Sequence, residues 1–390
     1  MGVGNMDKIV LPIAIGIIVD DVGWHDGRDL RYMNGSARSG LPRFHHPDDV
    51  RALNAIGKAL NTKIICSLVL GEWDKDNVLR GVPAVTPDPE NWDAAAVMDM
   101  EYTKEYFKAL EESEFLDYSL HGLLHAYYDG AKLNTARQYY PNTYAEDGKI
   151  NGYRWLPAEE FGKMIDLFYE IYGSWGFKKK ITTFVSPCGC WGVPEDEGNI
   201  GYAKMLLKHG IKYWCNSWAE FKKPIGNALG IMAVRGDNIA PWNAYDIDPD
   251  YLEPLEELGP YYCGHLTNFI RYNYQKNFEY VEKWAKYFRK YSDRFGAMMA
   301  RNIDESCSQM LYVKNAKLTE CDGVVTVDLA EVDSFGANGL FDEFFISIEG
   351  DHSPKILTEG ASIDYYECGD GYKTYKIKRC GAKLVSFALN

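Results

Sequence analysis

Two pairs of residues in this chain have the types and the spacing that metal chemistry requires. Asp20 and Asp21 end an apolar run that begins at Ile9, and His121 and His125 are separated by three residues. Two histidines four positions apart on one helical turn project to the same side, so both imidazoles can reach one ion. With one carboxylate they form a three-ligand site that leaves positions for water and substrate, as catalytic metal sites do. The alternative for the two aspartates is an Asp-rich turn or helix cap, and the alternative for the two histidines is a structural role in the core or in capping.

The elements that must position these residues alternate between strands and helices. Apolar, β-branched runs predict strands at 9–19, 63–70, 116–121, 181–185, 211–215, 230–234 and 260–265. Helical spacing of apolar residues predicts helices at 48–60, 100–112, 158–173, 199–209 and 276–294. This alternation predicts an irregular (β/α) barrel of about seven strands over residues 1–300. In such a barrel the carboxyl ends of the strands face the active site, where both residue pairs would lie.

The pattern changes near Arg301. Strand-like stretches at 323–329, 344–349 and 372–378 are separated by Gly, Asp and Asn, and we expect no helix among them. Residues 301–390 are therefore predicted to form a small β-sandwich, to which we assign no chemistry.

Composition limits the classes of partner. The 390 residues carry a net charge of −14, which repels nucleic acid phosphates and anionic lipids, so neither is expected as a partner. The 28 Tyr and 10 Trp favour carbohydrate, because aromatic faces stack on the apolar faces of sugar rings. The amino terminus lacks the basic segment and apolar stretch of an export signal, which favours a cytoplasmic location.

Taken together, the two motifs resemble those of the NodB-like polysaccharide deacetylases, a family related to carbohydrate esterase family 4. Val19-Asp20-Asp21 is similar to the first family motif, and His121-Gly-Leu-Leu-His125 is similar to the second. The resemblance implies that Asp21, His121 and His125 hold a divalent metal and that Asp20 is the general base. Zinc is the expected metal, with cobalt, manganese or nickel as alternatives. The implied reaction is removal of N- or O-acetyl groups from an acetylated carbohydrate.

Further segments match the family more loosely. Phe184-Val-Ser-Pro-Cys-Gly189 resembles the third motif, in which an arginine, a proline and a glycine wall the groove. Pro187 matches, but Val185 stands at the arginine position. Arg235, after the strand at 230–234, is a candidate replacement, with an ordinary surface arginine as the alternative. His265 is similar to the histidine that protonates the leaving group, and a buried structural histidine is its alternative.

Four tryptophans near strand exits are candidates for stacking on sugar rings or for the core: Trp24, Trp191, Trp214 and Trp242. Three other functions stay open. A glycoside hydrolase on the same barrel would use Asp20 with Glu72 and leave the histidines idle. A catalytically silent carbohydrate-binding protein and a zinc amidase would both keep the metal ligands. The sequence leaves open the metal, the acetylated compound and the oligomeric state.

Overall fold

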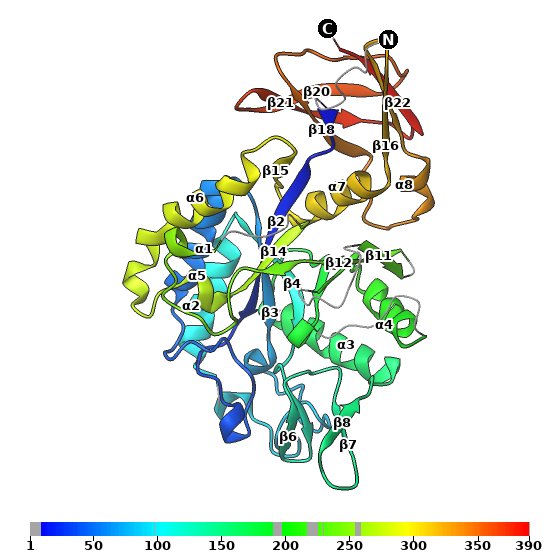
Figure 1. The fold of residues 1–390 in the computed structure, drawn as a ribbon. Coiled ribbons are helices and arrows are strands. Elements are labelled where there is room, and N and C mark those ends of the chain that lie inside the picture. The colour runs from blue at the N-terminus through cyan, green and yellow to red at the C-terminus, as the bar shows by residue number, and fades with distance from the viewer. Residues whose placement is uncertain are drawn as a thin grey trace.

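One large sheet organises most of the chain in the computed structural model, which describes residues 9–96, 98–189, 197–216, 225–228, 230–253 and 259–389. Its strands are β2 (Ile13–Val22), β3 (Ile64–Val69), β4 (Leu116–Gly122), β9 (Thr183–Val185), β10 (Tyr213–Asn216), β11 (Ile225–Ala228), β12 (Ile231–Arg235), β13 (Asp237–Asn238), β14 (Tyr261–His265) and β15 (Ala297–Met299). Strand β15 pairs with the start of β2 and lies off the path of the other nine. They follow the order β11-β12-β10-β9-β4-β3-β2-β14-β13 (Figure 1). All neighbours from β12 to β13 are parallel, whereas β11 runs antiparallel to β12.

The predicted (β/α) barrel is therefore confirmed, and each of the seven predicted strands is present in the sheet. Every side chain of β3 is buried, and so is nearly every side chain of β2 and β4. Burial of both faces is typical of a parallel sheet covered by helices and explains why these strands read as continuous apolar runs.

The predicted helices surround this sheet. They are α1 (Pro47–Leu60), α2 (Met100–Glu112), α3 (Ala158–Trp175), α4 (Glu197–Lys208) and α6 (Val281–Ser292). Helix α1 shows the local causes clearly. Pro47 occupies its first turn, where a missing N–H costs nothing, and Asn61 ends it in the left-handed conformation at φ 52°. Its buried residues Val50, Leu53, Ile56 and Leu60 recur at helical spacing and face the core.

The carboxyl-terminal region forms the predicted β-sandwich from two four-stranded sheets. One contains β1 (Ile9–Val10), β18 (Glu343–Glu349), β21 (Tyr372–Lys378) and β20 (Ser362–Gly369). The other contains β16 (Lys317–Cys321), β17 (Val324–Asp328), β22 (Leu384–Ala388) and β19 (Lys355–Ile356). Their facing side chains form a separate core that includes Val327, Ile346 and Phe387. The first strand of the chain thus pairs within this region before β2 enters the barrel sheet.

The expectation of no helix beyond Arg301 is wrong, because α7 (Ile303–Asn315) and α8 (Ala330–Ser334) lie there. Helix α7 has few side chains facing solvent, so its polar residues obscured the helical period. Gln309 of α7 donates to the carbonyls of Pro12 and Phe345 and accepts from the Phe345 N–H. These contacts join the sandwich to the start of β2.

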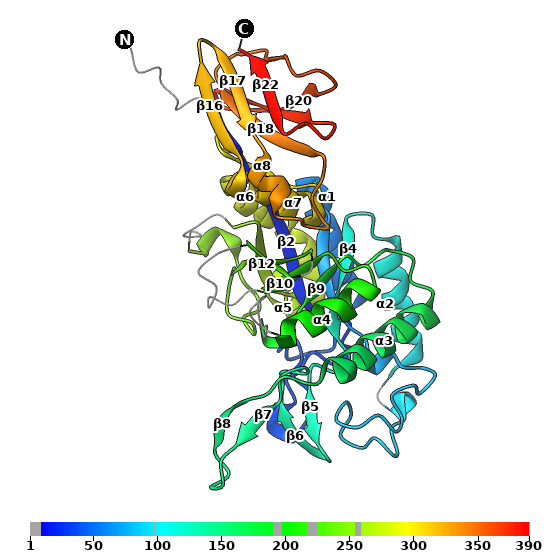
Figure 2. The same cartoon turned by 90° about the vertical axis from the view of Figure 1, so that its right-hand side faces the viewer.

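Two short hairpins project from the opposite end of the molecule (Figure 2). They consist of β5 (Tyr127–Asp129) with β6 (Lys132–Thr135), and of β7 (Asn142–Tyr144) with β8 (Ile150–Tyr153). The parallel strands run from the sandwich toward these hairpins, so their carboxyl ends face the hairpin end (Figures 1 and 2). Within the described residues, no helix is long and apolar enough to cross a membrane.

Candidate metal centre and active site

The end of β2 carries both aspartates into one cavity. Regular alternation would point Asp20 and Asp21 to opposite faces of the sheet. The register with β3 shifts between Val19 and Val22, however, and Asp21 adopts a left-handed φ of 63°. This irregularity lets both carboxylates line the same cavity. A left-handed residue other than glycine is strained, and such strain is characteristic of functional sites.

The second pair of ligands comes from the end of β4. The prediction that His121 and His125 share a helical turn is wrong, because His121 lies within β4 and His125 lies in the loop that follows. His125 has a left-handed φ of 48°. The chain turns sharply after Gly122 and thereby returns the second imidazole to the first, with 5.1 Å between the ring centroids.

A buried glutamine holds this turn in place. Gln138 Oε1 accepts hydrogen bonds from the backbone N–H groups of Leu123, Leu124 and His125 at 2.9–3.1 Å. Gln138 is fully buried, and a Cβ at Gly122 would lie only 2.8 Å from its Oε1. Sequence reasoning missed Gln138, because no local spacing connects it to a loop 13–15 residues upstream.

The three predicted metal ligands converge. One ligand atom each from Asp21, His121 and His125 lies within 4.8 Å of the others. His121 Nε2 and His125 Nε2 are 3.6 and 3.8 Å from Asp21 Oδ1. Ligand atoms around one tetrahedral zinc ion lie about 3.4 Å apart, so the spacing suits a single ion.

The surroundings of the ligands also fit a metal. His121 Nδ1 lies 2.7 Å from the Val185 carbonyl, which fixes the proton on Nδ1 and leaves Nε2 to bind. Asp21 Oδ1 is buried and has no hydrogen-bond partner among the described residues. A buried acceptor without a donor is costly, and a cation would satisfy it.

Burial and charge interactions within the site shift the pKa values of the three ligands in different directions. Burial lowers the pKa of His125 to about 4, so this imidazole is neutral and able to coordinate at neutral pH. Burial also opposes the charged form of His121, but the carboxylates of Asp20 and Asp21 outweigh it and raise the pKa of His121. Burial would raise the pKa of Asp21, yet the imidazoles of His121, His125 and His265 lower it, which keeps Asp21 ionised.

Asp20 and His265 flank this group from neighbouring strands. They are register partners in the parallel pair of β2 and β14, and both line the cavity. Asp20 Oδ2 accepts a hydrogen bond from the Cys263 thiol at 3.2 Å, whereas Oδ1 has no partner among the described residues. Burial raises the pKa of Cys263, so the thiol stays protonated and able to donate. The His265 N–H donates to Asn268 Oδ1, which holds the strand end against α5 (Leu266–Phe269).

A cavity of about 820 Å³ opens over the five residues. Beyond the metal centre its wall includes arginines, aromatics and polar residues from the loop after β2, from the hairpins and the segment between them, from the turn after β9, and from β13 and the segment that follows it. These are Arg31, Arg38, Asn134, Arg137, Tyr140, Asn142, Tyr153, Cys188, Asn238 and Trp242. The hairpins thus build the outer wall of the cavity.

The remaining candidates from the sequence lie in different places. Trp242 lines the cavity, whereas Trp24 and Trp214 are buried in the core. Pro187 is buried beside the cavity, and its neighbour Cys188 lines the wall. The backbone of Arg235 ends β12, but its side chain and all of Trp191 lie outside the described residues.

Glu72, the carboxylate considered for a glycosidase pair, does not line the cavity and forms an ion pair with Arg38. Burial raises its pKa to about 7, although Arg38 opposes the shift. Arg38 also donates to the Asp26 carbonyl and stacks on Trp24 at 5.2 Å. The two described carboxylates that do line the cavity are Asp20 and Asp21.

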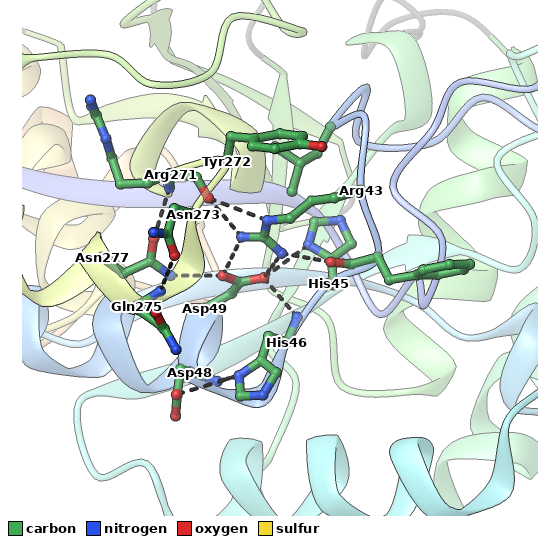
Figure 3. A network of polar contacts seen from close by, with 12 residues as sticks. Arg43, His45, His46, Asp48, Asp49, Arg271, Tyr272, Asn273, Gln275 and Asn277 are labelled. Atoms are coloured by element: carbon green, nitrogen blue, oxygen red, sulfur yellow. Dashed lines mark hydrogen bonds and ion pairs between the residues drawn. The ribbon is translucent and has the colours of Figure 1, made fainter.

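A polar network centred on Asp49 anchors the loop that carries Arg38 (Figure 3). Both Asp49 oxygens accept from the Arg43 guanidinium, at 2.7 and 2.9 Å, and Oδ1 also accepts from Asn277. Arg43 donates in turn to the carbonyl of Arg271, so the network joins α1 to the segment after β14.

The same network contains residues in the order of a hydrolase triad. Ser39 Oγ lies 2.7 Å from His45 Nε2, and His45 Nδ1 lies 3.4 Å from Asp49 Oδ2. Ser39 is fully buried, so no substrate reaches its hydroxyl and the arrangement is structural. The Ser39 carbonyl accepts from Thr267, which ties this loop to the segment that begins at His265.

Comparisons with known proteins bear on the fold. No protein-family model matches the chain, and no curated protein matches it significantly. Among solved structures it is similar to the carbohydrate deacetylase Agd3, with a TM-score of 0.50 and 10% identity over 97% of this chain. A 4-alpha-glucanotransferase from Thermococcus litoralis has a TM-score of 0.40 at 11% identity, over 77% of this chain and 40% of the enzyme. A CE4 family pseudoenzyme from Bacillus anthracis has a TM-score of 0.33 at 11% identity, over 70% of this chain and 61% of that protein.

Of these three matches we draw the fold from Agd3, which has the highest TM-score. This chain spans 65% of the length of Agd3. The molecule shares its fold, an irregular (β/α) barrel, with this carbohydrate deacetylase, and carries a β-sandwich at its carboxyl end. A shared fold does not by itself define an activity, which has to be argued from the site.

Proposed function

We propose that this protein is a metal-dependent deacetylase that hydrolyses N- or O-acetyl groups on a carbohydrate. The observation that carries the proposal is the convergence of Asp21, His121 and His125 within 4.8 Å at a cavity that Asp20 and His265 also line. These are the ligands, the base and the acid that hydrolysis of an acetyl group requires.

Asp21, His121 and His125 would hold the ion. Zinc suits one carboxylate and two imidazoles, and cobalt, manganese or nickel would accept the same donors. When bound, such an ion acts as a Lewis acid toward the acetyl carbonyl and lowers the pKa of water. The Val185 carbonyl orients His121, and Gln138 orients the loop of His125, so the ligands are positioned before the ion arrives.

The remaining steps fall to the chain's own side chains. Asp20 accepts the proton of the attacking water through the oxygen that makes no hydrogen bond, while the Cys263 thiol fixes its other oxygen. We assign oxyanion stabilisation to a backbone N–H of the turn at 187–189, whose Cys188 lines the cavity. His265, protonated, gives its proton to the departing amine or hydroxyl.

A glycoside hydrolase is less consistent with the geometry. Such an enzyme needs two carboxylates that flank the scissile bond. Glu72 is held by Arg38 outside the cavity, and Asp21 lies against two imidazoles. A zinc amidase would use the same ligands on a smaller substrate, and a silent binding protein would keep the metal without turnover.

The test is to measure bound metal and acetate release together. The purified protein is loaded with zinc, analysed by inductively coupled plasma mass spectrometry, and incubated with N- and O-acetylated oligosaccharides. We expect about one ion per chain, acetate release that chelation abolishes, and loss of both in His121→Ala. His209→Ala is the control, because His209 lies at the surface and pairs with Asp166. Metal bound without acetate release would favour the silent binding protein, and activity that survives chelation would contradict the proposal.

A further inference from the structure

The cavity wall has a charge opposite to that of the whole chain. The chain has 56 acidic and 42 basic residues, but the described lining of the cavity includes three arginines: Arg31, Arg38 and Arg137. The acidic residues among its described lining are Asp20 and Asp21, which belong to the metal centre. A divalent ion would balance these two carboxylates, so the guanidinium groups determine the charge that a substrate meets.

Two of the arginines are already paired inside the protein. Arg31 forms an ion pair with Asp29 at 2.9 Å and lies over the ring of Trp242 at 5.0 Å. Arg38 is bound by Glu72 and also contacts Asp26. Their charges are therefore partly balanced before any ligand binds.

Arg137 differs from both. Across the described part of the chain, no carboxylate lies within ion-pair distance of its guanidinium. The group instead lies over the ring of Tyr153 at 5.8 Å, and both residues line the cavity. A guanidinium that rests on an aromatic face keeps its N–H edge available for a planar anion. The segment between the two hairpins thus supplies a half-buried cation at the outer wall.

This cation lines the same cavity as the metal centre. Cys188, which lines the same wall, has a pKa of about 12, raised first by burial and then by the charge of Asp21. The charges of Arg31 and Arg137 act on the same thiol in the opposite direction. Arg137 and the metal ligands line the same cavity, so a group bound at Arg137 and an acetyl group at the metal centre would occupy one cavity.

We propose that the cavity selects acidic carbohydrates: the acetylated sugar or its neighbour carries a carboxylate or a sulfate ester that Arg137 binds. The proposal rests on the proposed deacetylase function for the identity of the acetylated ligand. The anionic subsite itself requires no turnover, so it can be tested separately.

The test is isothermal titration calorimetry on the full chain, with zinc and again with chelator, using ligands without acetyl groups. The ligands are a tetrasaccharide of uronic acids, its neutral methyl ester and a sulfated neutral tetrasaccharide. We expect at least one anionic ligand to bind about tenfold more tightly than the methyl ester, as one charge-assisted contact would give. The stronger of the two identifies the anionic group.

Variants assign this preference to one side chain. Arg137→Gln should abolish it, Arg137→Lys should retain part of it, and Lys132→Gln should leave it intact. Lys132 is the matched control, because it is an exposed cation on β6, five residues before Arg137, and does not line the cavity.

Two results would overturn the proposal: a methyl ester that binds as tightly as both anions, or an Arg137→Gln variant that weakens all three ligands equally. Failure of the deacetylase function has a different signature, in which the preference for anions persists but no acetate is released from acetylated ligands.

Discussion

Replacing Asp49 by Asn should destabilise the protein in a way that depends on pH. Asp49 is fully buried and accepts hydrogen bonds from Arg43, Asn277 and the His46 backbone. Burial alone would raise the pKa of Asp49, but His45 and Arg43 outweigh it and lower the pKa to about 2, against 3.8 for an ordinary aspartate. The ionised carboxylate is therefore bound more strongly in the folded state than in the unfolded state.

The magnitude follows from the size of this shift. A difference of about 1.8 pH units, at 1.36 kcal/mol per unit, contributes about 2 kcal/mol to the free energy of unfolding. Because the folded pKa lies below the unfolded one, this contribution is complete above about pH 5 and falls as the pH falls toward 2. About 1 kcal/mol of it should be lost between pH 7 and pH 3. Asp49→Asn also leaves the Arg43 cation buried without its partner, so the total loss at pH 7 should be about 3–5 kcal/mol.

The assay is urea unfolding, followed by circular dichroism, of the wild-type protein and Asp49→Asn at pH 7 and at pH 3. The difference in the free energy of unfolding between the two proteins should be about 1 kcal/mol smaller at pH 3. Asp48→Asn is the control: Asp48 pairs with Arg51 at the surface, and its loss should cost less than about 1 kcal/mol. A difference that stays constant from pH 7 to pH 3, or an Asp49 variant as stable as the Asp48 variant, would refute the reasoning.

Three further predictions concern the site. Asp20→Asn should lower the rate of acetate release by about 100–10,000-fold, because it removes the general base. The metal content, measured by mass spectrometry, should stay unchanged because the metal ligands remain. A variant as active as the wild type would exclude Asp20 as the base. Gln138→Leu removes the acceptor of three N–H groups in the loop of His125. It should weaken zinc binding about 10–100-fold, measured by competition with a chelator. An unchanged zinc affinity would limit Gln138 to a packing role. Gly23→Ala should lower the unfolding temperature, because Gly23 has a φ of 127° and a Cβ there would lie 2.4 Å from the Val69 carbonyl oxygen. An unchanged unfolding temperature would show that the turn relaxes freely.

Much of the barrel could be predicted from sequence because its signals are local. Strands such as β3 are buried along their whole length and read as continuous apolar runs, and helices such as α1 bury one face and show a helical period. Both patterns therefore report the structure directly. The ends of β2 and β4 then placed Asp21 and His121 on the same edge of the sheet. The helical turn predicted for His121 and His125 was wrong, because spacing alone does not distinguish a helix from a strand followed by a sharp loop.

Contacts between distant segments explain what the sequence did not reveal. Gln138 orients His125 from the hairpin region, Cys263 binds Asp20 from a neighbouring strand, and Arg137 reaches the cavity from an insertion with weak strand signals. Neither Gln138 nor Arg137 has a periodic or motif neighbour that marks its role, and Cys263 lies beside the motif residue His265 without any local sign of its contact with Asp20. Residue types and local spacing identified the three candidate metal ligands and the strands that carry them. Tertiary structure decided the convergence of the donors, because the strain at Asp21 and His125 is maintained by packing and hydrogen bonds from elsewhere in the chain.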